Sequence, residues 1–276
     1  MGLFNWGNVK PMKEGKGVEP KKESALSVFF GVLQRKLGRF ITLNILHVLT
    51  ALPTFLFMGC IGLTLLYFHS GRAVSSNAFL PMMLILIPFI GVISGPATMG
   101  VTYVLRNFAR EQHAWIMGDT FEKASKNYLQ GMIIGVINAV LAFLLVFAYL
   151  YYGYFATGTL ALTPMNYIII LLGIILASLR SYIYPMAVSY KLSIKNLYRY
   201  SLALVVMKFP QNLLLQIFSA ALIYGAFYYP NVGIVILAVI GAALLGFINV
   251  FYTDRVLLAN MDETNEKIYP QKEHRL

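Results

Sequence analysis

Cysteine and acidic residues are scarce in this chain. Among its 276 residues there is one cysteine, Cys60, so an internal disulfide or a cysteine zinc cluster is excluded. Asp and Glu number 11 against 22 Lys and Arg, and no acidic residue lies inside a long apolar run. This argues against a proton-coupled pump, because its proton relay normally requires carboxylates within the membrane.

Sequence signatures of catalysis are also missing. The chain has no Walker loop, no H-E-x-x-H and no G-x-S-x-G, and the apolar runs contain no carboxylate pair. We therefore expect neither an enzyme nor a bound metal or cofactor.

What the sequence does contain is long apolar stretches, with 58% hydrophobic and 12% charged residues overall. This composition is typical of a membrane protein. Each stretch is long enough for a helix to cross the ~30 Å hydrocarbon core of a bilayer. The six predicted spans are 40–68, 79–105, 130–155, 166–190, 209–229 and 231–253. The fold class we expect is an all-α polytopic membrane protein.

The basic residues predict the orientation of these spans. Eight Lys and Arg precede the first span, and four each lie between spans two and three, between spans four and five, and after span six. The three connections on the other side of the membrane contain a single basic residue, Arg72. Because cytoplasmic loops retain positive charge, both termini are expected in the cytoplasm. The net charge of +11 then favours the anionic cytoplasmic leaflet as partner, rather than nucleic acid.

Four segments follow from this pattern. Residues 1–23 are polar and predict a flexible cytoplasmic tail rather than a cleavable signal peptide. Residues 24–39 predict an amphipathic helix, capped by Ser24, that lies in the headgroup layer or docks a partner. The transmembrane domain occupies 40–254, and 255–276 form a second cytoplasmic tail.

The cytoplasmic connections mix charges of both signs, which suits either simple solvation or contact with a partner protein. The candidate partner-contact residues are Arg106, Arg110, Asp119, Glu122, Lys195 and Arg199.

Glycine and proline mark the backbone positions of most interest. Gly91 and Gly95 form one GxxxG pair, and the pair 131/135 offers a second, so that helices can approach closely. Pro96 and Pro185 lie inside spans and can kink them. A carbonyl freed by Pro96 needs a partner, which Thr98 is placed to supply. The kink serves packing or, alternatively, breaks the helix beside a cavity.

Arg180 is the charged side chain deepest inside a span, ten residues before Tyr190, or roughly 15 Å along a helix. It is either a structural hydrogen-bond hub or a ligand-binding residue. Asn44, His47 and Asn138 are further intramembrane polar candidates. A lone His predicts packing rather than a metal ligand, because no second ligand is in helical register.

Several short motifs resemble the YesL-like family of small bacterial membrane proteins. They are Asn44 followed by an apolar stretch and Pro53, Gly95-Pro96-Ala97-Thr98 ahead of Tyr103 and Arg106, and Tyr184-Pro185-Met186-Ala187 ahead of a basic segment. The resemblance implies a multi-pass protein of the bacterial plasma membrane. It also implies an association with carbohydrate uptake systems that contain ABC-type sugar permeases.

Three functions are consistent with these observations. The first is an accessory or regulatory subunit of a carbohydrate uptake system, with a sugar permease as partner. The second is an autonomous small-molecule transporter or channel. The third is a membrane scaffold or signalling partner.

Overall fold

A computed structural model describes residues 24–50, 52, 76–152 and 163–262. Every regular element within these ranges is a helix. The elements in chain order are α1 (Ala25–Arg35), a helix over Leu37–Thr50, α3 (Ser76–Ala109), α4 (Ile116–Lys126), α5 (Tyr128–Leu150), α6 (Pro164–Ser189), α7 (Ile194–Met207), α8 (Phe209–Tyr228), α9 (Pro230–Ile236), the π-helical η3 (Leu237–Gly241), α10 (Ala242–Leu257) and the π-helical η4 (Leu258–Asp262).

The helices include segments long and apolar enough to cross a membrane. Within the described ranges, three qualify: Tyr128–Tyr149, Pro164–Ser189 and Asn231–Asn260. A fourth is α7 with α8, if this pair is counted as one span despite the bend of 92° between its halves. The all-helical membrane fold is thus confirmed in its coarse form. The count of six spans and the orientation stay predictions, and residues 53–68 of the first predicted span lie outside the described ranges.

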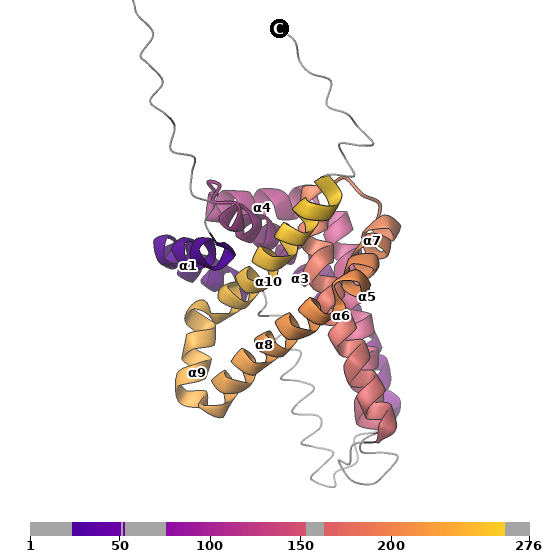
Figure 1. Ribbon diagram of the computed structural model, residues 1–276. Coiled ribbons are helices and arrows are strands. Elements are labelled where there is room, and N and C mark those ends of the chain that lie inside the picture. The colour runs from indigo at the N-terminus through magenta and orange to yellow at the C-terminus, as the bar shows by residue number, and fades with distance from the viewer. Residues whose placement is uncertain (1–23, 51, 53–75, 153–162, 263–276) are drawn as a thin grey trace, which may run out of the picture.

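Figure 1 shows that α1, α4 and the last turns of α10 lie at the same end of the bundle, where the described chain both begins and ends. The hairpin of α8 and α9 lies at the opposite end. Toward that end the α5–α6 pair diverges from α8 and α9 (Figure 1). The last helix continues through η4 to Asp262, beyond the predicted boundary of the transmembrane domain at 254, which stays a prediction.

The predicted N-terminal amphipathic segment is a short helix, α1, followed by a second helix. The Ser24 hydroxyl accepts a hydrogen bond from the Ser27 amide and caps it. Phe29 stacks on Phe247 of α10 with ring centroids 5.2 Å apart, so one face of α1 packs on the bundle. Leu26 and Phe30 remain exposed and give α1 a second apolar face. The position of this helix in the headgroup layer stays a prediction.

The tightest helix contact joins α3 to α5 through the two GxxxG pairs. A Cβ at Gly95 would fall on the carbonyl oxygen of Gly131 and lie 3.0 Å from Gly135 Cα. A Cβ at Gly135 would lie 2.8 Å from Gly95 Cα, and one at Gly91 would meet the backbone of 135–136. Glycine at these positions is therefore what lets the two backbones touch.

Proline does not break the helices that contain it. Pro96 lies inside the continuous α3, and Pro185 lies inside the continuous α6. The Thr98 hydroxyl donates to the Ser94 carbonyl at 2.7 Å, rather than to the Val92 carbonyl that Pro96 leaves without an amide. Of the two alternatives at Pro96, the broken helix does not match the continuous α3, and a kink that serves packing stays a prediction. The sharp break in the bundle falls instead at Lys208, between α7 and α8.

Candidate functional site

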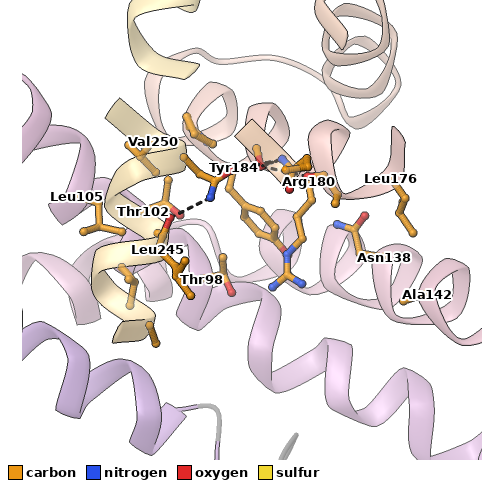
Figure 2. Close-up of a pocket in the computed structure, with 18 of the residues that line it drawn as sticks. Thr98, Thr102, Leu105, Asn138, Ala142, Leu176, Arg180, Tyr184, Leu245 and Val250 are labelled. Carbon is orange, nitrogen blue, oxygen red and sulfur yellow. Dashed lines mark hydrogen bonds between the residues drawn. The ribbon is translucent and has the colours of Figure 1, made fainter. Parts of the chain in front are cut away.

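A cavity of about 540 Å³ opens between the helices of the bundle. Its walls come from the helix over Leu37–Thr50 and from α3, α5, α6, α8 and α10 (Figure 2). The volume falls within the range of about 300–1,000 Å³ that is usual for small-molecule sites. Its polar lining residues are His47, Thr98, Thr102, Asn138, Arg180, Ser181, Tyr184, Gln216 and Asn249.

Arg180 supplies the positive charge of this cavity. Its guanidinium extends into the cavity beside the ring of Tyr184, one turn further along α6 (Figure 2). Its Cζ lies 5.8 Å from the centroid of that ring, within reach of a cation–π interaction. None of the ion pairs between described residues involves Arg180.

The sequence explains why Arg180 has no carboxylate partner nearby. Residues 24–110 and 123–253 contain no Asp or Glu, so neither the transmembrane helices nor the connections within these ranges carry one. An Arg at the centre of a membrane helix costs about 2.5–3.5 kcal/mol on insertion scales. Arg180 lies beside an accessible cavity, where water or a ligand can solvate its charge.

Asn138 and His47 add hydrogen-bonding groups to the same cavity. Asn138 is only 7% exposed, and neither atom of its amide has a hydrogen-bond partner of normal geometry among the described residues. It makes a loose contact with the Tyr184 hydroxyl. Nδ1 of His47 is likewise buried without a described partner, and His47 interacts electrostatically with Arg180. Buried amides without partners are costly, so a ligand that bonds to them gains affinity.

A second polar cluster, next to Arg180, is satisfied internally. Ser181 donates to Asn249 Oδ1 at 3.1 Å, and Gln216 Nε2 reaches both of them at 3.4 Å. Asn249 Nδ2 donates to its own helix at Leu245 and contacts Ser219 of α8. This cluster joins α6, α8 and α10 along one wall of the cavity, where its groups bond to one another, whereas Arg180, Asn138 and His47 take no part in it.

Asn44, the fourth predicted member of the polar site, lies elsewhere. Its Nδ2 donates to the carbonyls of Leu237 and Ala238 at 3.2 and 2.6 Å, and its Oδ1 accepts from the Ala243 amide at 2.7 Å. These backbone groups belong to η3 and the start of α10, where the π-helical pattern disturbs the ordinary hydrogen bonding of an α-helix. Asn44 is therefore a structural residue and does not line the cavity.

Two predicted partner contacts are also occupied within the chain. Arg106 donates to the Val188 carbonyl at 3.0 Å and to the Ser189 hydroxyl at 3.1 Å, at the end of α6. Arg110, one turn on, forms a two-pronged ion pair with Asp254 of α10 at 2.7 and 2.8 Å. These arginines link α3 to α6 and α10, so both have partners within the chain, and their contact with another protein stays a prediction.

The remaining partner candidates lie on the outside of the same end. Asp119 accepts from the Trp115 amide at the start of α4. Glu122 pairs with Lys126 one turn away at 2.6 Å, and this hydrogen bond lowers the pKa of Glu122. Lys195 and Arg199 on α7 are exposed. Glu122, Lys195 and Arg199 are therefore accessible to a partner, while Asp119 serves its own helix.

Some lining residues escaped the sequence analysis. Tyr184 was noted as part of a family motif, and its role beside Arg180 was missed, although their spacing of four places both on one helix face. Ser181 and Gln216 also line the cavity. Their signal was present as polar residues within apolar spans, but the sequence could not show that they face each other.

No protein-family model, curated protein or solved structure matches this chain. The resemblance to the YesL-like family therefore stays a prediction. What the helices support is the broader class of helical membrane protein, with a polar cavity among its helices.

Proposed function

We propose that this integral membrane protein binds a small polar solute in the cavity around Arg180 and carries it across the bilayer. The observation that carries the proposal is an arginine with no paired carboxylate, deep in a predicted span, facing a cavity of about 540 Å³. Intramembrane charges of this kind commonly mark substrate or ion pathways.

The surrounding helices fit this function. Substrate sites in many transporters lie near the bilayer midplane, between helices that are interrupted or sharply bent. Here Gln216 of α8 lines the cavity, and α8 follows α7 after a bend of 92°. The bend gives α7 and α8 different directions in the bundle, so α8 crosses the cavity wall at a steep angle to α7.

A pair of glycine substitutions tests this function directly. Gly173 lines the cavity and Gly225 of α8 does not, yet a Cβ at either position meets nothing within 4 Å. Liposomes containing the purified protein and loaded with a mixture of cellular metabolites should lose at least one solute selectively, as measured by mass spectrometry of their contents. Gly173→Phe fills the cavity and should abolish this loss, whereas Gly225→Phe should leave it unchanged.

Two results would contradict the proposal. One is retention of every solute by the protein-containing liposomes, as in empty ones. The other is equal flux through the Gly173→Phe and Gly225→Phe variants.

An accessory role in carbohydrate uptake is the second proposal, and it depends on the family resemblance. The charged side chains of Glu122, Lys195 and Arg199 are accessible at one end of the bundle and could form the contact surface for such a permease. This second proposal includes a location in the bacterial plasma membrane, with both termini in the cytoplasm. Extraction of the tagged protein in mild detergent should then recover a stoichiometric ABC-type sugar permease, and recovery of the protein alone would count against this role.

A further inference from the structure

We propose that the solute is an organic monoanion, whose carboxylate or phosphodiester group pairs with Arg180 while its apolar part fills the rest of the cavity. This inference rests on the proposed function and specifies the charge and character of the ligand.

The charge of the cavity argues for a single negative charge. Arg180 is the one Lys, Arg, Asp or Glu among the described lining residues. The sequence offers no carboxylate within 24–110 or 123–253 to neutralise it, and Asp254, at the end of α10, is already paired with Arg110. A monoanion would bring the net charge of the cavity to zero, whereas a cation would be repelled by the like charge of Arg180.

The polar groups suit the oxygen atoms of an anionic head group. A guanidinium presents paired donors that match a carboxylate or phosphate. Asn138 and His47 reach the same cavity with buried polar atoms that lack described partners, and Asn138 is more than nine-tenths buried. The amide of Asn138 can donate to an anion oxygen that Arg180 leaves unbonded.

The remaining walls argue against a bare inorganic ion. They include the aliphatic side chains of Leu105, Leu245 and Val250 on one side and of Leu176 on the other (Figure 2). Leu145 and Val146 also line the cavity. An inorganic anion would leave this apolar surface wet, whereas an organic body of matching size gains free energy by covering it.

The experiment compares ligands that differ only in charge. Butyrate, octanoate and benzoate are each matched with the corresponding primary amide and amine, and binding to the purified protein in zwitterionic nanodiscs is measured from the melting temperature. At least one carboxylate should stabilise the protein, and its amide and amine should not. The Kd of that carboxylate should rise at least about tenfold in Arg180→Gln. The rise should be smaller in Arg180→Lys, which keeps the positive charge but lacks the paired N–H donors of a guanidinium.

Asn138→Leu provides a second variant, in case Arg180→Gln fails to fold, and it should also weaken the carboxylate. Adding phosphatidylglycerol to the nanodiscs separates the two sources of the anion. Displacement of the carboxylate by this lipid, dependent on Arg180, identifies a lipid headgroup, and absence of displacement identifies a soluble acid.

The proposal is overturned if neither a carboxylate nor phosphatidylglycerol stabilises the protein, if an amide or amine binds as tightly as its acid, or if Arg180→Gln leaves the Kd unchanged. The results that would refute the anion preference differ from those that would refute the proposed transport function. Neutral probes whose binding is lost in Gly173→Phe would preserve the cavity site and refute only its anion preference. Solute flux that persists unchanged in Gly173→Phe would refute the site itself.

Discussion

Gly95→Ala should destabilise the protein by about 3 kcal/mol, the upper end of the roughly 1–3 kcal/mol that small-to-large changes cost in well-packed interiors. Here the new methyl group meets backbone, the carbonyl of Gly131 and the Cα of Gly135, so α3 and α5 must separate along their seam. Titration with sodium dodecyl sulfate, followed by circular dichroism or protease resistance, measures the loss of stability.

Gly225→Ala is the matched control for this change. It is the same substitution inside a helix, but the added methyl group has no neighbour within 4 Å. Alanine has the higher helix propensity, so this variant should be as stable as the parent or slightly more so. Equal unfolding midpoints for the two variants would show that the α3–α5 seam does not hold the bundle together.

Asp254→Asn should cost about 3 kcal/mol of folding free energy. The side chain of Asp254 is 2% exposed, and its carboxylate accepts two hydrogen bonds from Arg110, whose side chain is 25% exposed. Removing one partner of a buried pair is strongly destabilising, because the other charge stays buried without compensation. The same detergent titration measures the effect, and a double-mutant cycle with Arg110→Gln isolates the coupling between the two residues.

The exposed pair of Glu122 and Lys126 supplies the comparison. Glu122→Gln removes a contact of similar length at the surface, where screening by water leaves ion pairs with little effect on stability. It should not shift the unfolding midpoint measurably. A loss in Asp254→Asn no larger than in Glu122→Gln would contradict the assignment of Arg110 and Asp254 as a link between α3 and α10.

The parts of the fold that follow from local pattern were predictable. Apolar length located α5, α6 and α8 to within a few residues, because a helix in hydrocarbon must satisfy its backbone internally. Spacing alone identified both GxxxG pairs. The sequence could not show that Asp254 meets Arg110 across 144 positions, and so it offered Arg106 and Arg110 to a partner protein.

The sequence indicated most of the residues of the candidate site, but it could not show which of them lie together in space. Arg180, His47 and Asn138 stood out as polar side chains in apolar spans, and they share one cavity. Asn44 carried the same signal, but its amide serves the π-helical η3 of a distant helix. The π-helical η3 has no sequence signature of its own. Pro210 marks the start of α8 just after Lys208, but tertiary contacts set the angle of the bend there.

The most direct test asks whether the cavity around Arg180 is an aqueous and electropositive space within the bilayer. With Cys60 replaced by Ser, a thiol is introduced by Ala142→Cys, which lines the cavity, or by Leu144→Cys, which is exposed on α5 without lining it. Membrane-impermeant thiosulfonate reagents are then applied to the reconstituted protein. We expect labelling at 142, faster with an anionic reagent than with a cationic one because Arg180 attracts it, and no labelling at 144. Equal inertness at both positions would contradict the account.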